Sequence, residues 1–257
     1  MPARMRRIAV ASALFFGVTA VGVRPAAANA QVSGTITISA ASSLRESFVA
    51  IGKAFRAANP KVRVRFNFGS SSTLVSQIIA GAPADVVAVA DLATMDKLVS
   101  QGSITGTPKV FARNSMVIAV KPGNPHKISS VADLARVGVV ALCVVTAPCG
   151  GYAKSVLSRS GVSLAESSIT RGIDVAATLA QVTTGDAQAA IVYSTDVLAA
   201  GSAVSGVTIP RASNVTAMYP IASIKGSANA DAARAFVEFV TSDKGWSILK
   251  SYGFLRP

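Results

Sequence analysis

Histidine, cysteine and acidic residues are scarce in this sequence of 257 residues, which holds one His, two Cys, and 12 Asp or Glu against 25 Lys or Arg. A Ser-His-Asp or Cys-His enzyme would have to use His126, which stands beside Pro125 in an expected surface loop, and no G-x-S-x-G sequence occurs. The acids are isolated, so no metal site is expected. No G-x-G-x-x-G or Walker sequence indicates a nucleotide cofactor. We therefore expect neither an enzyme nor a cofactor.

The excess of basic residues gives a formal net charge of +13, which raises the question of a nucleic-acid partner. The Lys and Arg residues are scattered singly, however, with few aromatic residues between them and no DNA-binding pattern. In an exported protein, a basic surface is better suited to steering small anions. We expect no nucleic-acid partner.

Residues 1–30 have the pattern of a cleaved signal peptide. Three Arg residues precede an apolar run over residues 8–23, and Ala28-Asn29-Ala30 forms an A-x-A cleavage sequence. The apolar run is short for a membrane span and contains two Gly residues. We expect cleavage after Ala30 and a soluble protein in the periplasm or elsewhere outside the cytoplasm.

The stretch from Ile36 to Phe48 reads as a short buried strand, a turn of small residues and the start of a helix. Ser43-Leu44-Arg45-Glu46 has the S-x-x-E pattern of a capping box, so Ser43 could simply cap its own helix. A helix start also carries unpaired N–H groups that bind anions. Similar small-residue helix starts follow strands near residues 69–74, 147–153 and 172–178, which favours the anion-binding interpretation.

Strands and helices alternate along the whole chain after residue 30, which predicts an α/β fold built on mostly parallel sheets flanked by helices. The pattern changes near Arg113–Asn114 and returns near Ala217. We predict two lobes with two hinge crossings: residues 31–114 and 217–257 form lobe 1, and residues 115–216 form lobe 2. Ligands of such folds bind at the carboxyl ends of the strands.

The two cysteines, Cys143 and Cys149, are five loop residues apart. In an oxidising compartment this spacing favours a disulfide that stiffens a local turn. Two free thiols are the alternative, and the intact mass with and without reductant distinguishes them.

Seven short segments resemble, in order, those of the periplasmic molybdate-binding proteins of ABC importers. They are Ala40-Ala-Ser-Ser-Leu44, Gly69-Ser-Ser-Ser-Thr-Leu74, Gly81-Ala-Pro-Ala-Asp85, Pro148-Cys-Gly-Gly-Tyr-Ala153, Ile173-Asp-Val175, Ile191-Val-Tyr-Ser-Thr-Asp196 and Tyr252-Gly-Phe254. The resemblance covers nearly the whole chain after residue 30. It implies a two-lobed, type II periplasmic binding protein that closes on one molybdate or tungstate ion and delivers it to a membrane permease.

The resemblance also implies which residues bind the oxyanion. Ser43 and Ser71 would donate through hydroxyl and backbone N–H groups, Cys149 and Val175 through backbone N–H groups, and Tyr193 through its phenol. Cys149 stands where Ala is usual, and Ser42 adds a second hydroxyl beside Ser43. Molybdenum would be bound only as its oxyanion, and the protein would act as a monomer.

Several alternatives stay open at this point. Neutral donors disfavour an anion that still carries a proton, such as phosphate, but they accept sulfate, which only the cavity size could reject. A binding protein for sulfate or another small oxyanion is therefore a close alternative. An exported hydrolase that uses one of the Ser turns lacks a base other than His126, and a sensor or adhesion module would need an extra partner-binding segment.

Overall fold

The computed structural model describes Met1 and residues 32–257, and within this range nine strands alternate with helices. The strands are β1 (Gly34–Ala41), β2 (Val62–Gly69), β3 (Val86–Ala88), β4 (Ile104–Val120), β5 (Val140–Cys143), β6 (Ile169–Gly172), β7 (Ala189–Tyr193), β8 (Ser205–Thr208) and β9 (Thr216–Ile224). The helices are α1 (Arg45–Ala58), α2 (Ser71–Ile79), α3 (Leu92–Ser100), α4 (Pro148–Arg159), α5 (Val175–Thr183), α6 (Ser194–Ala200), α7 (Ala230–Thr241) and α8 (Asp243–Ser251). Short 3-10 helices are η1 (Ser42–Leu44), η2 (Val131–Arg136), η3 (Glu166–Ser168) and η4 (Gly201–Ala203).

The strands pair in the order β2-β1-β3-β9-β4-β7-β5-β6, with β8 paired to β4. Parallel pairs lie towards both ends: β1 pairs with β2 and β3, and β5 pairs with β6 and β7. The long strand β4 pairs antiparallel with β9 up to Ser115 and with β7 from Met116 onward. The structure thus confirms the α/β class, with antiparallel strands joining two parallel sets.

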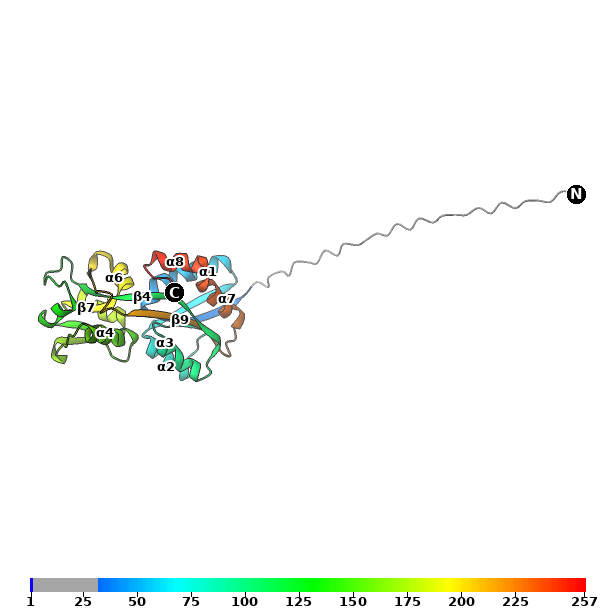
Figure 1. Cartoon of the computed structure of the whole chain (residues 1–257). Helices are drawn as coiled ribbons and strands as arrows, with labels where there is room; N and C mark the ends of the chain where they lie inside the picture. The colour runs from blue at the N-terminus through cyan, green and yellow to red at the C-terminus, as the bar shows by residue number, and fades with distance from the viewer. Residues whose placement is uncertain (2–31) are drawn as a thin grey trace. The chain divides into compact units, whose positions relative to one another are not determined.

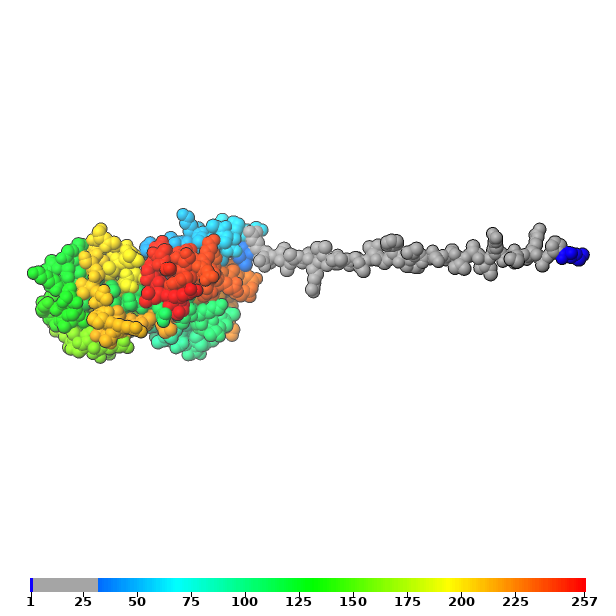
Figure 2. Space-filling view, turned by 45° about the horizontal axis from the view of Figure 1, so that its top comes forward, coloured from blue at the N-terminus to red at the C-terminus, as the bar shows by residue number. Residues whose placement is uncertain are grey.

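Strands β4 and β9 run between two halves of the molecule (Figure 1). We call β1–β3 with α1–α3, α7 and α8 the first half, and β5–β8 with α4–α6 the second half. The division into moving lobes at residues 31–114, 115–216 and 217–257 stays a prediction. The C-terminal segment packs against the second half, where a Cβ at Gly253 would approach the side chain of Leu198, and the red C-terminal surface adjoins the yellow residues in Figure 2.

The sheet of the first half is buried on both faces, as expected for parallel strands covered by helices. Val86 and Ala88 face a large core that contains Phe48, Phe55 and Phe236 of α1 and α7. The intervening Val87 faces a second core under α2 and α3. Aromatic rings of α1 and α7 pack edge to face, with 5.2 Å between the centroids of Phe55 and Phe236. This packing fixes the position of the turn that follows β1.

Two features of the fold differ from the sequence-based expectation. Strand β4 begins at Ile104 and runs through the change of pattern near Arg113–Asn114, because register shifts after Thr105 and Val110 interrupt the alternation that identifies a strand. The short edge strand β8 was not predicted. The signal peptide expected over residues 1–30 lies, Met1 aside, outside the described residues. No helix in the described part of the chain is long and apolar enough to cross a membrane.

Candidate functional site

A small cavity lies between the two halves, where β1, β2 and β7 end and α4 and α5 begin. Its volume is about 10 Å³, about enough for one water molecule. It is lined by Ala41, Ser42, Ser43, Gly69, Ser70, Ser71, Ala90, Ala147, Pro148, Cys149, Asp174, Val175 and Tyr193. All five residues implied by the resemblance, and the additional Ser42, therefore line one cavity. An ion larger than a water molecule therefore fits only if the walls of the cavity move apart, and such a ligand must be compact and must enter without its hydration shell.

Several helix starts meet at the cavity without the side-chain caps that usually satisfy them. Within residues 32–257, no cap side chain bonds to the first turn of η1, α2 or α4. Helix α5 differs, because Asp174 accepts a hydrogen bond from the N–H of Ala177 at 2.9 Å. Uncapped first turns present N–H groups and the positive ends of helix dipoles to a ligand. The cavity can therefore hold an anion.

The capping box predicted for Ser43 and Glu46 is wrong. The chain forms η1 at this point, and the hydroxyl of Ser43 bonds instead to the phenol of Tyr219 at 3.0 Å. The side-chain amide of Asn114 donates to the same phenol at 3.5 Å. With that donor in place, Tyr219 can donate its own proton to Ser43, which leaves the Ser43 proton for a ligand.

The hydroxyl of Ser71 is also held by a hydrogen bond within the protein. Its side chain is buried, and its Oγ accepts a hydrogen bond from the backbone N–H of Ala90 at 3.1 Å. Because the oxygen is already an acceptor, the hydroxyl proton remains available as a donor. Ser71 is thus oriented by the protein to donate, and Ser43 is free to donate whenever Tyr219 donates to it.

The phenol of Tyr193 is the clearest sign that the cavity can bind a hydrogen-bond acceptor. The residue is 1 % exposed, and its OH has no hydrogen-bond partner among the residues that the structure describes. Burial raises its pKa well above the usual value, and the neighbouring Tyr219, Tyr152, Asp196 and Asp91 add to the rise. The phenol therefore stays protonated. An unpaired buried donor costs about 1–3 kcal/mol, which an acceptor in the cavity would remove.

The predicted disulfide between Cys143 and Cys149 is confirmed. It ties the end of β5 to the first turn of α4, the turn that brings Cys149 to the cavity. Gly150 follows, and a Cβ there would clash with the carbonyl of Val144. The bond and the glycine together fix the start of α4 against the second half of the sheet.

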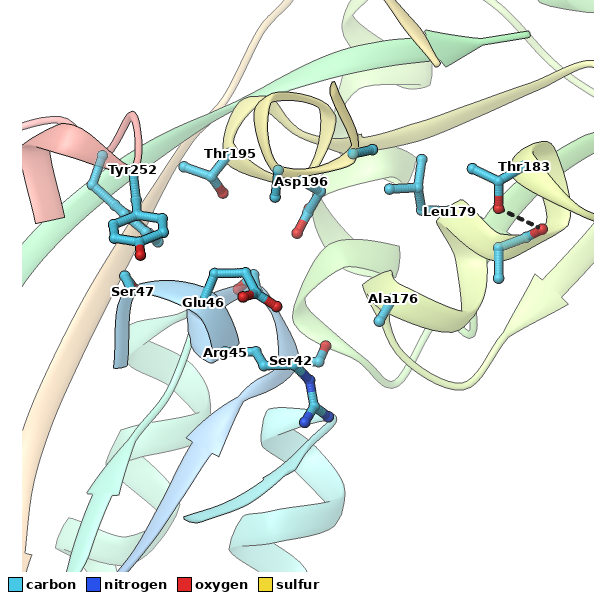
Figure 3. A pocket seen from close by; sticks show the side chains of 15 residues that line it. Ser42, Arg45, Glu46, Ser47, Ala176, Leu179, Thr183, Thr195, Asp196 and Tyr252 are labelled. Atoms are coloured by element: carbon cyan, nitrogen blue, oxygen red, sulfur yellow. Dashed lines mark hydrogen bonds between the residues drawn. The ribbon is translucent and has the colours of Figure 1, made fainter. Parts of the chain in front are cut away.

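A larger crevice of about 290 Å³ adjoins the cavity and shares Ser42 and Ser43 with it. Figure 3 shows the side chains of Glu46 and Asp196 pointing into it from α1 and α6. Burial raises the pKa of Asp196 to about 7, nearby Asp174 adds to the rise, and a hydrogen bond from the N–H of Tyr193 opposes it. Arg45 also lines the crevice. Two carboxylates make this space a poorer anion site than the cavity.

The cavity itself has no Lys or Arg among its described lining residues, and its one acid is the helix cap Asp174. His126 does not line it; this exposed side chain bonds to Gln188 at 2.8 Å, as expected for a surface loop. Sequence reasoning missed Ala90, which orients Ser71, and Tyr219, which orients Ser43. Their roles depend on contacts 19 and 176 residues apart, which no local pattern reveals.

Comparison with known proteins agrees with this geometry. Residues 36–255 match the family model described as bacterial extracellular solute-binding protein. The chain is 40 % identical over 228 residues to the molybdate-binding protein ModA of Mycobacterium tuberculosis, covering 88 % of this chain and 87 % of that one. It is 32 % identical over 230 residues to ModA of Escherichia coli, covering 86 % and 89 %.

The solved structure of the Azotobacter vinelandii periplasmic molybdate-binding protein has the same fold, with a TM-score of 0.79 at 22 % identity over 86 % of this chain and 99 % of that one. The family model and the two sequence relatives each span most of the chain. This chain belongs to the bacterial extracellular solute-binding proteins, a family of binding proteins rather than enzymes.

Proposed function

We propose that this protein captures molybdate or tungstate and delivers it to the membrane permease of an ABC importer. The observation that carries the proposal is the buried phenol of Tyr193, which has no partner among the described residues and lines a cavity of uncapped helix starts. The identity to molybdate-binding relatives supports the choice of anion.

In this proposal Ser43 and Ser71 donate from the first half, and Cys149, Val175 and Tyr193 donate from the second. Ser42 lies close enough to the same cavity to add a further donor. An ion that receives bonds from both halves stabilises the closed form. The proposed lobes, residues 31–114 with 217–257 and residues 115–216, then move about β4 and β9, and the permease recognises the closed form of a monomer outside the cytoplasm.

Sulfate or another small oxyanion is the second candidate, because the cavity offers mainly neutral donors, which also suit a fully ionised sulfate. Size must separate the two, since the shorter bonds of sulfate leave donors stretched. Phosphate brings a proton that needs an acceptor, and among the described lining side chains only Asp174 carries a carboxylate. That carboxylate already caps α5, so we expect phosphate to bind poorly.

Calorimetric titration of residues 31–257 with molybdate, tungstate, sulfate and phosphate tests the proposal. We expect one-to-one binding of the first two and much weaker binding of sulfate. Equal or tighter sulfate binding would overturn the choice of anion while keeping the binding role. Binding led by phosphate would likewise overturn the choice of anion while keeping the binding role.

A further inference from the structure

Two hydrogen bonds cross between the halves beside the cavity. The hydroxyl of Ser72, in the first half, donates to the carbonyl of Thr146 in the second half at 2.5 Å. The phenol of Tyr152, in the second half, donates to the carbonyl of Ala90 in the first half at 3.2 Å. Each half therefore supplies one donor and one acceptor. Neither donor lines the cavity.

Both bonds are attached directly to the residues that would hold the anion. Ser72 follows Ser71 in the first turn of α2. Ala90 accepts from Tyr152 through its carbonyl and donates to the Oγ of Ser71 through its N–H. The Tyr152 ring packs edge to face on Tyr193, with 6.3 Å between the centroids. A change in the contact between the halves would therefore shift the hydroxyl of Ser71 in the first half and the phenol of Tyr193 in the second.

The phenol of Tyr152 remains a hydrogen-bond donor at neutral pH. Burial and the carboxylate of Asp91 raise the pKa of its phenol, against a smaller opposing effect from the backbone of Met218. The OH therefore keeps its proton at neutral pH. Met218 belongs to β9, one of the two strands that join the halves.

We propose that Ser72 and Tyr152 form a latch that holds the halves closed over the bound anion without touching it. This inference rests on the proposed function. In an open form both bonds break, so their loss lowers the population of the closed form and releases the anion faster. Because the latch does not contact the anion, its loss must weaken every bound anion by the same factor. This makes Ser72 and Tyr152 positioning residues rather than ligands.

The test measures the dissociation constants and release rates of molybdate and tungstate for Tyr152→Phe, Ser72→Ala and the double variant. A single hydrogen bond contributes about 0.5–1.5 kcal/mol, so each single variant should bind about 2- to 12-fold more weakly. We expect the loss to be mainly in the release rate and to be equal for both anions. Tyr252→Phe removes a phenol from the neighbouring crevice, and Ser76→Ala an exposed hydroxyl on the same helix α2; both controls should bind like the unmodified protein.

An unchanged release rate in the double variant would overturn the latch, as would a loss that differs between the two anions, since that would make Tyr152 or Ser72 a ligand. If the unmodified protein binds sulfate or phosphate instead, the proposed anion is wrong and the same variants are measured with the anion that binds. If none of the four anions binds, both proposals fail. Should the double variant not fold, Ser72→Ala, which removes a hydroxyl from the partly exposed Ser72, still decides the question.

Discussion

The cavity and the crevice beside it are formed between the same two halves and share two serines, yet they differ in size and in charge. The crevice is far larger, at about 290 Å³ against about 10 Å³. It receives the carboxylates of Glu46 and Asp196, whereas the cavity receives uncapped helix starts and a phenol that has no partner within residues 32–257. This difference is why we propose the cavity, with its unsatisfied donors, rather than the larger crevice as the anion site.

The hydrogen bonds that the lining side chains make within the protein also differ between the cavity and the crevice. In the cavity, the oxygen of Ser71 accepts a hydrogen bond within the protein, so that its proton remains available, and the Ser43 proton is available whenever Tyr219 is the donor of their shared bond. In the crevice, Asp196 is an acceptor occupied by the N–H of Tyr193. One space therefore offers donors, while the other offers acceptors. Changing the charge or the number of these donors and acceptors should therefore change anion binding in predictable ways.

The largest effect is expected from Ser71→Asp, which gives the cavity the negative charge of the crevice. A like charge against a desolvated anion costs several kcal/mol, so affinity should fall roughly 1,000-fold. Asp is favourable in the first turn of a helix, so the variant should fold. Calorimetry measures the loss. The matched control is Ser76→Asp, which adds the same charge to an exposed position of α2; if both variants lose affinity equally, long-range charge and not the cavity is responsible.

Tyr193→Phe removes the unpaired phenol from the cavity. We expect a loss of roughly 1–3 kcal/mol of binding free energy, because one donor to a charged ligand disappears. Without ligand, the variant should melt at the same or a higher temperature, since a buried OH without a partner among the described residues is removed. Titration and thermal unfolding of the same samples check both expectations. Unchanged affinity would mean that Tyr193 does not bind the ligand.

The resemblance to a known family implied the site residues, which the structure brings to one cavity, and most of them also stand in a recognisable local pattern. Ser71, Cys149 and Val175 occupy the first turns of helices that follow strands, and Tyr193 ends a strand. Two aspartates directly before helices, Asp91 and Asp174, cap α3 and α5 in the structure. The disulfide followed from the spacing of two cysteines and the expectation of export.

What the sequence could not reveal depends on contacts between distant segments. Ser43 has the pattern of a cap, but its actual partner, Tyr219, comes from β9. Tyr152 lies in a segment that resembles the family, although only the structure brings its phenol to Ala90. The raised pKa of Asp196 results from burial beneath elements that fold around it. Burial and pairing of this kind are properties of the assembled fold.

The disulfide is another difference between the cavity and the crevice, because it fixes a wall of the cavity only. Reducing Cys143–Cys149 should lower the free energy of unfolding by about 2 kcal/mol, as estimated for a short closed loop. Denaturant unfolding with and without reductant measures this loss, and intact mass confirms the reduction. A Cys143→Ala, Cys149→Ala double variant should give the same unfolding curve in both conditions. Affinity for the anion should also fall on reduction, because the start of α4 becomes less ordered.

A further difference concerns pH, to which the crevice should respond and the cavity should not. The pKa of Asp196 is raised to about 7, whereas an Asp in the unfolded chain titrates near about 3.9. The folded protein therefore binds this proton more tightly. The stability that the protonated form contributes is full below about pH 4, declines as pH rises, and is lost above about pH 7.

Asp196→Asn isolates this contribution, since its amide oxygen can still accept from the N–H of Tyr193 but cannot ionise. Relative to the unmodified protein, the variant should gain thermal stability between pH 5 and pH 8. Glu46→Gln changes the exposed carboxylate on the opposite wall and should follow the unmodified protein across this range. If the melting temperatures of Asp196→Asn and of the unmodified protein instead change in parallel between pH 5 and pH 8, Asp196 is ionised in the folded protein across this whole range. The charge of Asp196 would then be the same at pH 5 and at pH 8, and its part in the contrast with the neutral donors of the cavity would not depend on pH.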